Sequence, residues 1–372
     1  MPSDRPHFIV RSHDPLNGGP DHTVLGREFI TPNDLFFVRN HGNVPEVDAA
    51  NYRLNVGGML GCPVSYSLDD LAQCFERVEV ISTLACAGQR RQEMAAMKPI
   101  PGELPWGAEA VSTAVWSGWR LKDVLAASKP DGGARHVAFE GLDDVERRGE
   151  RFKYGTSIPL EKALGDDVLL ADRMNGEPLP AAHGFPLRVV VPGYIGARQV
   201  KWLSTIELRS ASSENYFQRI AYRRYPSDME AATLDPERGI ELTELEINCV
   251  ITEPLAGQPV SGEHVTVRGV AYTGGDAQVA SVELSSDGGA SWHEARLLRP
   301  PVDGRWTWRQ FEGELPLPSA NGATEAAGTV EILARAGDTC DQRQPADASA
   351  IWNFKGYMNN AWCRVKVQQT SP

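Results

Sequence analysis

The hydrophobic pattern of this 372-residue chain changes near residue 235, and the change limits the architectures open to it. Upstream, buried apolar runs alternate with short helix signals, such as Ser67 in the capping position before a helix that begins at Leu68. Downstream, short alternating strands are separated by turn residues, and they cover 264–272, 279–286, 305–309 and 329–336. We therefore predict an α+β domain over residues 1–235, followed by an immunoglobulin-like β-sandwich over 236–372.

Apolar and β-branched runs give the strands expected in the first of these domains. They cover 53–60, 79–84 and 185–193. The first 50 residues are rich in Pro, Gly, Asn and Asp, so we expect them to be irregular, with residues 1–30 as an N-terminal arm.

The chain is acidic: 37 Lys and Arg against 49 Asp and Glu give a net charge of −12. A general nucleic-acid or membrane-surface protein needs a basic face, so we expect neither partner, and any anion site must be locally basic. No apolar run suits a membrane helix, and the N-terminus shows no secretory signal. Six cysteines without a C-x-x-C pair favour a reducing, cytoplasmic location, with the periplasm as the alternative if an export signal had been removed.

The stretch from Ser82 to Arg91 carries the strongest chemical signal. A buried strand leads into Cys86, which small residues and then Arg90 and Arg91 follow. Neighbouring guanidinium groups favour a thiolate, which is a nucleophile or a ligand for a soft metal, and they also bind oxyanions. The alternative is a buried structural cysteine beside a surface arginine pair.

Three further segments concentrate positive charge in this acidic chain. They are Phe36–His41, the stretch from His183 through Arg188 to Trp202, and Phe217–Tyr225 with its interleaved tyrosines. Cations beside a Gly-rich turn suit phosphate binding, but neither a Walker A loop nor a Rossmann fingerprint is present. Taken singly, each segment could equally be a set of solvated loop charges.

Together these segments resemble motifs of the sulfite oxidase family of molybdenum enzymes, in its haem-less bacterial or plant-type form. Cys86–Arg91 is similar to the family's C-A-G-N-R-R motif, and Phe36–His41 to its F-F-x-R-N-H segment. His183–Arg188 is similar to H-G-F-P-x-R, and Gly196–Trp202 to G-A-R-x-V-K-W. The matches run in order over roughly residues 25–370, which makes the resemblance specific.

The resemblance implies a fold, a cofactor and an assembly. Residues 1–235 would form the mixed α/β molybdopterin-binding catalytic domain, and 236–372 the immunoglobulin-like dimerisation domain of a homodimer. The chain would bind molybdenum-molybdopterin with Cys86 as the metal ligand, a soft donor that suits this metal. No haem-binding domain precedes the matched segment, so no haem is expected in this chain.

The resemblance also implies residue roles by position. Catalytic residues around a substrate anion are expected at Arg39, His41, Arg91, Tyr222 and Lys355. Cofactor-binding residues are expected at Phe37, Val38, Arg39, Asn40, His41, Asp143, His183, Arg188, Gln199, Val200 and Lys201. Two positions depart from the vertebrate members: Ala221 stands where they carry Asp, and Lys355 where they carry Arg.

The implied reaction is the molybdenum-dependent oxidation of sulfite to sulfate by oxygen-atom transfer, with electrons passed to oxygen or to an external c-type cytochrome. Within the same fold, a nitrate reductase-like activity or another sulfur-compound oxidoreductase is the alternative. Two hypotheses of other classes stay open at this point. One is a non-enzymatic interaction protein that uses the β-sandwich, and the other is a hydrolase that uses Cys86 with His183.

Overall fold

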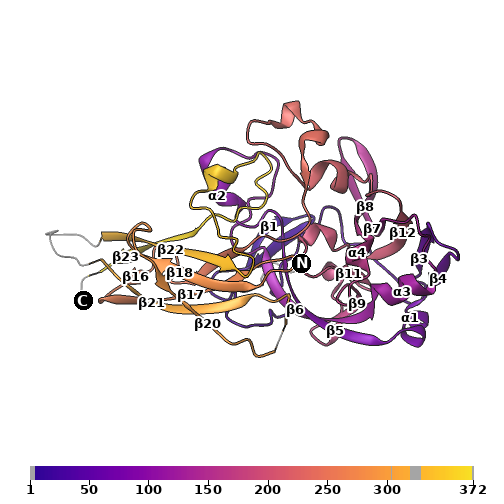
Figure 1. Ribbon diagram of the computed structural model, residues 1–372, viewed down its shortest axis with the longest axis horizontal. Coiled ribbons are helices and arrows are strands. Elements are labelled where there is room, and N and C mark those ends of the chain that lie inside the picture. Colours follow the sequence, from indigo (N-terminus) through magenta and orange to yellow (C-terminus); the bar gives the residue numbers. More distant parts are fainter. Residues whose placement is uncertain (1–4, 303, 319–327, 371–372) are drawn as a thin grey trace.

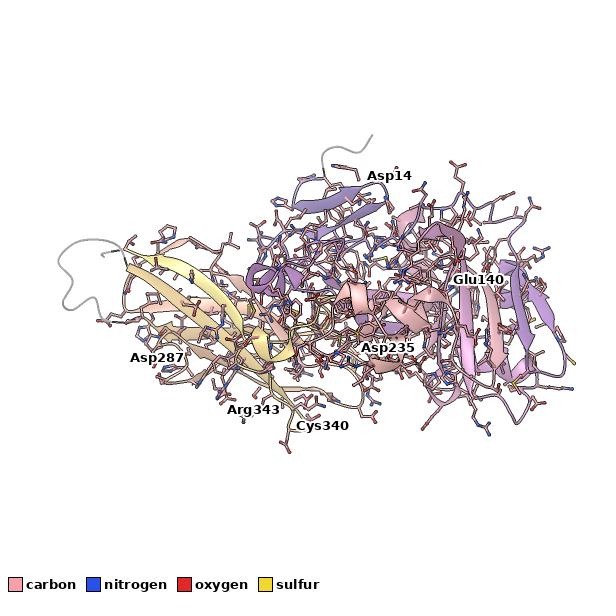
Figure 2. The ribbon with its side chains drawn as sticks, turned by 90° about the horizontal axis from the view of Figure 1, so that it is seen from above. Asp14, Glu140, Asp235, Asp287, Cys340 and Arg343 are labelled. Atoms are coloured by element: carbon pink, nitrogen blue, oxygen red, sulfur yellow. The ribbon has the colours of Figure 1, made fainter. Side chains whose placement is uncertain are left out.

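The computed structural model describes residues 5–302, 304–318 and 328–370. Residues 1–4 of the expected arm lie outside these ranges, as do 303, 319–327 and 371–372 of the expected second domain. The sheets built from the first part of the chain lie at one end of the long axis, and the strands after residue 247 lie at the other (Figure 1). Figure 2 shows Asp235 near the middle, between Glu140 in the first set of sheets and Asp287 in the second.

Two five-stranded sheets form the framework of the first part. One has the order β10-β9-β6-β5, with β11 also paired to β9, and its strands are β5 (Arg77–Ala85), β6 (Val111–Arg120), β9 (Leu169–Met174), β10 (Glu177–Pro178) and β11 (Arg188–Val190). The other has the order β4-β3-β12-β7-β8, and its strands are β3 (Leu54–Gly58), β4 (Val64–Tyr66), β7 (His136–Arg147), β8 (Glu150–Pro159) and β12 (Leu203–Arg209).

Short helices connect these strands. They are α1 (Leu68–Cys74), α2 (Arg91–Met97), α3 (Leu121–Ala127) and α4 (Leu160–Ala163). Helix α1 begins where the sequence predicts, because Ser67 and Asp70 form a capping box that satisfies two otherwise free backbone N–H groups. Within the described ranges, no helix has the length and apolar character needed to span a membrane.

The second part packs two sheets face to face. The four-stranded sheet has the order β15-β17-β21-β20, from β15 (Asn248–Glu253), β17 (His264–Tyr272), β20 (Arg296–Leu297) and β21 (Arg309–Pro316). The five-stranded sheet has the order β16-β23-β22-β18-β19, from β16 (Pro259–Val260), β18 (Val279–Ser285), β19 (His293–Glu294), β22 (Gly328–Asp338) and β23 (Cys363–Gln369). An apolar cluster that includes Val267, Phe311 and Ile332 fills the space between them. The predicted α+β class followed by a β-sandwich is confirmed.

Three local predictions are wrong. The start of the chain is not irregular throughout, because β1 (Phe8–His13) and β2 (Leu16–Pro20) form an antiparallel hairpin. In 185–193 only β11 is a strand, since the proline at 186 has no N–H to donate and Pro192-Gly193 turn the chain. The segment 305–309 is mostly not a strand.

Long-range contacts decide the conformation of 305–309. Thr83 N donates to the carbonyl of Trp306 at 2.8 Å, and Trp308 N donates to Thr83 Oγ1 at 2.7 Å. Trp308 is fully buried in the largest apolar cluster of the molecule, which also holds Val250 and Val270 from the second part. The end of β5, which leads to Cys86, is therefore fixed by contacts from both parts. A division of the chain at residue 235 into separate folding units stays a prediction.

Candidate active site

Cys86 lies directly after β5, and the pairing of β5 with β6 fixes its position. The two strands pair from Arg77↔Trp119 to Ala85↔Val111, and Cys86 N then donates to the carbonyl of Ala110 at 2.9 Å. The Gly88 N–H points at the Cys86 sulfur at 3.4 Å. The sulfur is therefore held at the end of a rigid strand, with a backbone donor that stabilises negative charge on it.

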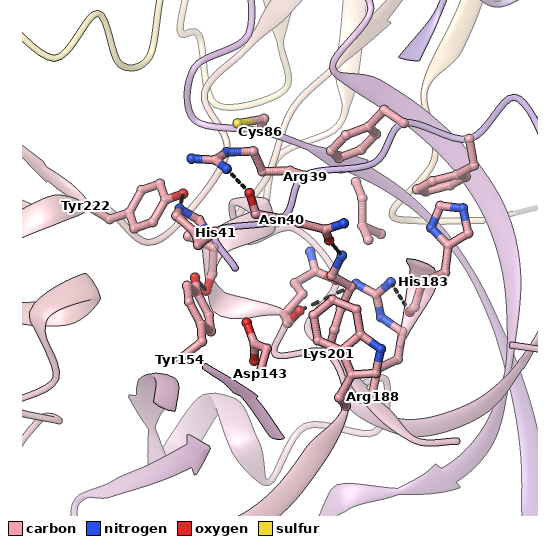
Figure 3. Close-up of a pocket in the computed structure, with 17 residues that line it drawn as sticks. Arg39, Asn40, His41, Cys86, Asp143, Tyr154, His183, Arg188, Lys201 and Tyr222 are labelled. Atoms are coloured by element: carbon pink, nitrogen blue, oxygen red, sulfur yellow. Dashed lines mark hydrogen bonds between the residues drawn. The ribbon is translucent and has the colours of Figure 1, made fainter. Parts of the chain in front are cut away.

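Cys86 lines a cavity to which all three basic segments contribute residues (Figure 3). Of the predicted site residues, the structure brings eleven together in its wall: Phe37, Arg39, Asn40, His41, Cys86, Asp143, His183, Arg188, Gln199, Lys201 and Tyr222. Figure 3 shows Cys86 on the same side of the group as Arg39 and Tyr222, with Arg188 and Lys201 on the other side. Segments more than 100 residues apart in sequence thus form one pocket.

Burial lowers the pKa of three basic groups in this pocket, and neighbouring cations add to the effect at two of them. Burial lowers the pKa of Lys201 well below its usual range, and Arg188 adds to the effect. The pKa of Arg188 falls to about 9 through burial. Burial also lowers the pKa of His183, with Lys201 and Arg188 contributing. These three basic groups favour an anion, which would restore their positive charge.

Asp143 is the carboxylate in the lining of this cavity. Burial raises its pKa to about 6, although Lys201 opposes the shift. Its neighbour Asp144 points out of the cavity and pairs with Lys153 at 2.9 Å and with Arg151 at 3.2 Å. The alternation of side chains along β7 explains this division, because adjacent residues of a strand face opposite sides.

His41 and Tyr222 form a polar pair in the wall of the cavity. Tyr222 Oη and His41 Nε2 are 2.9 Å apart. His41 stacks on Tyr154 with ring centroids 5.1 Å apart and meets Phe217 edge-on at 4.4 Å. Burial, with Arg39 next, lowers the pKa of His41 well below its usual range, whereas burial raises the pKa of Tyr222. Near neutral pH the pair is therefore a neutral imidazole beside a protonated phenol.

Four predicted site residues do not line this cavity. Val38 and Val200 are buried, but neither belongs to its lining. Lys355 lines an adjoining cavity, which shares Arg39, Asn40 and His41 with the first. Arg91 lies behind Tyr357, with its guanidinium carbon 5.1 Å from the ring centroid, and Tyr357 in turn stacks on Tyr222 at 5.3 Å.

Sequence reasoning missed two polar residues of the site. Tyr154 lines the main cavity and donates to the carbonyl of Ala197 at 2.7 Å. Glu103 lines the adjoining cavity and accepts from Lys355 Nζ at 2.9 Å. The Tyr154-Gly155-Thr156 run could have identified the first, but Glu103 lies in a loop whose local sequence carries no signal.

The pocket residues fit an anionic, metal-carrying cofactor. Arg188 Nε and Asp143 Oδ1 are buried without a hydrogen-bond partner in the protein, so the pocket offers one donor and one acceptor to a ligand. The backbone at Gly196 passes close to the Cys86 strand, since a Cβ there would lie 3.3 Å from the carbonyl oxygen of Ala85. A thiolate, several cations and free polar atoms together suit a soft metal on an anionic carrier.

Comparison with known families agrees with this geometry. Residues 41–217 match the family described as "Oxidoreductase molybdopterin binding domain", and residues 240–370 match "Mo-co oxidoreductase dimerisation domain". Together these matches define the chain as a molybdopterin oxidoreductase.

Individual relatives show which family of molybdopterin oxidoreductases the chain belongs to. The chain is 40% identical to sulfite oxidase of Gallus gallus, over 98% of this chain and 78% of that protein. It is 41% identical to mitochondrial sulfite oxidase of Homo sapiens, over 98% of this chain and 66% of that protein. The chain belongs to the sulfite oxidase family. This membership argues against the non-enzymatic and Cys–His hydrolase hypotheses.

Two further similarities show that proteins with other names share this fold. The nitrate reductase of Hordeum vulgare is 38% identical over 96% of this chain but only 41% of that protein. The crystal structure of the sulfane dehydrogenase SoxCD from Paracoccus pantotrophus superposes with a TM-score of 0.79 at 22% identity, over 99% of this chain and 91% of that chain. At this identity the likeness shows the shared fold.

Proposed function

We propose that this chain is a sulfite oxidase or sulfite dehydrogenase, which converts sulfite to sulfate with molybdenum-molybdopterin. One observation carries the proposal: a buried cationic pocket places the Cys86 sulfur, Arg39 and the Tyr222–His41 pair in one wall. The names of the most similar relatives, among them the chicken and human sulfite oxidases, point to the same substrate.

Cys86 would hold the metal, and the polar lining would hold the rest of the cofactor. The negative charge of the cofactor would be bound by Arg188, Lys201 and His183. Hydrogen bonds would be accepted from it, or donated to it, by Asp143 and Gln199. When bound, the cofactor supplies oxygen-atom transfer to sulfur and stores the two electrons that sulfite loses. The protein supplies position and charge.

Arg39 and the Tyr222–His41 pair would act on the substrate. Arg39 lines the main cavity and the adjoining cavity, so its guanidinium can attract a sulfite ion that enters through the adjoining cavity. In the tautomer with its proton on Nδ1, His41 accepts from the Tyr222 hydroxyl at 2.9 Å. That pair can orient a sulfite oxygen or hold a proton beside it.

We also propose that Lys355 and Arg91 contribute positive charge at the entrance rather than direct contact in the main cavity. The acceptor would be oxygen or an external c-type cytochrome, and a basic cytochrome would suit the net charge of −12. The homodimer would form through residues 240–370, which match the dimerisation family. All six cysteines are free, which supports a reducing compartment such as the cytoplasm.

Steady-state kinetics on protein of measured molybdenum content test the proposed function. We expect about one molybdenum per chain and turnover of sulfite with oxygen or cytochrome c as acceptor. Nitrate, assayed with a reduced dye, should turn over far more slowly. Metal-loaded protein that reduces nitrate but leaves sulfite unchanged would reject the proposal in favour of the nitrate reductase-like alternative.

The pH dependence of stability tests the fit between pocket and cofactor without using activity. In cofactor-free protein, burial lowers the pKa of Lys201 and His183, so the unfolded state binds more protons. Stability then falls as the pH drops below the ordinary values of about 10.4 for Lys and about 6.5 for His. An anionic cofactor offsets this loss.

We therefore expect the Tm difference between loaded and cofactor-free protein to widen from about pH 8 to about pH 5.5, the range in which His183 gains its proton in the unfolded state. Differential scanning calorimetry of the two forms measures it. A difference that stays constant across this range would show that the pocket does not bind a compensating negative charge.

A further inference from the structure

Glu103 places a carboxylate among the cations at the entrance of the site. It belongs to the loop between α2 and β6, and it lines the adjoining cavity with Arg39, Lys355 and Tyr357. Glu103 Oε1 lies 2.9 Å from Lys355 Nζ, and Oε2 lies 3.8 Å from the nearest Arg91 nitrogen. The side chains of Glu103 and Lys355 are each only 17% exposed, so water screens this pair weakly.

Lys355 and Arg91 already have polar partners in this arrangement. Arg91 Nε donates to the carbonyl of Lys355 at 2.9 Å, and its Nη1 donates to the carbonyl of Leu104 at 2.8 Å. Its other terminal nitrogen faces Glu103. Gly88 and Gly356 pack against the Arg91 side chain so closely that a Cβ at either would lie within 2.6 Å of it. Arg91 is therefore fixed in place by these backbone acceptors and by close packing.

The negative charge of Glu103 also reaches the inner residues. Burial is the main reason why the pKa of Tyr357 lies well above its usual range, and Glu103 is the next contributor. Tyr357 stacks on Tyr222, which lines the main cavity. An anion that enters the adjoining cavity therefore meets the Glu103 carboxylate. This carboxylate already faces Lys355 and Arg91, the cations that the anion would use.

We propose that Glu103 is an internal counter-anion that competes with the substrate for Lys355 and Arg91, and so sets the affinity of the site for oxyanions. The inference rests on the proposed function, because it takes sulfite and sulfate as the competing ions. Sulfite binds when the Glu103 carboxylate turns from Lys355 toward solvent, and its return helps to expel sulfate. Glu103 is thus a residue that determines affinity and specificity.

The test compares metal-loaded parent enzyme with Glu103→Gln. Gln keeps the shape and can still accept a hydrogen bond from Lys355, but it carries no charge. We expect KM for sulfite and the inhibition constant of sulfate each to fall about tenfold, because both dianions lose the same competitor. The matched control is Glu294→Gln, which removes the same charge from an exposed position in β19 of the β-sandwich. It should leave both constants unchanged.

Calorimetric titration of sulfate into the same proteins separates this inference from the proposed function. Tighter sulfate binding by Glu103→Gln than by Glu294→Gln supports the inference even in a protein that does not turn over sulfite. Equal or weaker sulfate binding by Glu103→Gln, in protein of parent-like Tm and molybdenum content, overturns it. In that case Glu103 would be a positioning residue for Lys355, and sulfite oxidation itself would stand.

Discussion

Replacing Cys86 with Ser is expected to remove sulfite oxidation almost completely while the fold is retained. The sulfur is the protein's soft donor in the pocket wall, and a serine hydroxyl is a much harder ligand. Loss of an outer partner of a metal site typically lowers affinity or activity 10–100-fold, so loss of the ligand itself should exceed about 100-fold. The substitution is nearly isosteric, and the Gly88 N–H can still donate to the oxygen.

Molybdenum content, pterin content and kcat should be measured together for this variant. The matched control is Cys62→Ser, which makes the same change at an exposed cysteine. We expect Cys86→Ser to lose turnover even where pterin is still bound, and Cys62→Ser to match the parent. If Cys86→Ser kept its metal and oxidised sulfite at the parent rate, Cys86 would not be the ligand.

The cysteine and its pocket could be predicted from sequence because their determinants are local. A β-branched run predicts β5, and Cys86 follows it directly with small residues and arginines. The other segments are also short continuous runs, and nine of the predicted residues that they contain line one cavity with Cys86 and Asp143. Periodicity alone did not predict which of these runs would meet in the folded chain. That expectation came from the resemblance to a family.

Features that depend on distant contacts escaped sequence reasoning. Trp306 and Trp308 look like alternating strand residues, but hydrogen bonds to Thr83 hold this segment against β5 instead. Glu103 is an ordinary loop carboxylate until the chain brings Lys355, 252 residues later, to within 2.9 Å of it. The same long-range contact holds Lys355 in the adjoining cavity, beside Glu103.

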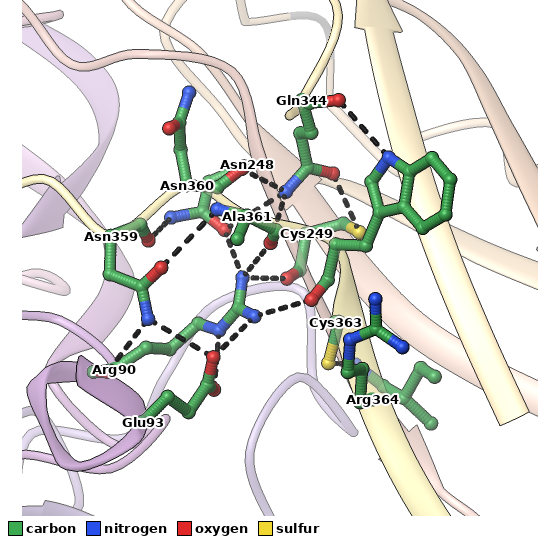
Figure 4. A network of polar contacts seen from close by, with 12 residues as sticks. Arg90, Glu93, Asn248, Cys249, Gln344, Asn359, Asn360, Ala361, Cys363 and Arg364 are labelled. Carbon is green, nitrogen blue, oxygen red and sulfur yellow. Dashed lines mark hydrogen bonds and ion pairs between the residues drawn. The ribbon is translucent and has the colours of Figure 1, made fainter. Parts of the chain in front are cut away.

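Arg90 is the residue that ties the cysteine loop to the second part of the chain (Figure 4). Its side chain is 1% exposed, and its Nη1 donates to Asn248 Oδ1 at 2.9 Å and to the carbonyl of Ala361 at 2.7 Å. Its Nη2 donates to the carbonyl of Trp362 at 3.0 Å and pairs with Glu93 at 2.8 Å. The Arg90 backbone carbonyl in turn accepts from Asn359 at 2.9 Å.

Arg90→Met is therefore expected to lower the free energy of unfolding by about 3–5 kcal/mol, because several buried hydrogen-bond acceptors lose their donor at about 1–3 kcal/mol each. Met retains most of the volume but leaves Asn248 Oδ1 and three carbonyls without this donor. Because Cys86 lies four residues upstream, the loop that holds it should also lose its anchor, so cofactor retention should fall with stability.

Urea denaturation followed by fluorescence, together with molybdenum retention on gel filtration, measures both effects. Arg299→Met is the matched control, since it makes the same substitution at an exposed arginine. We expect the control to stay within about 0.5 kcal/mol of the parent, as surface substitutions usually do. Equal losses in the two variants would mean that the Arg90 network does not hold the two parts together, and the Cys86 loop would then depend on β5 and β6 alone.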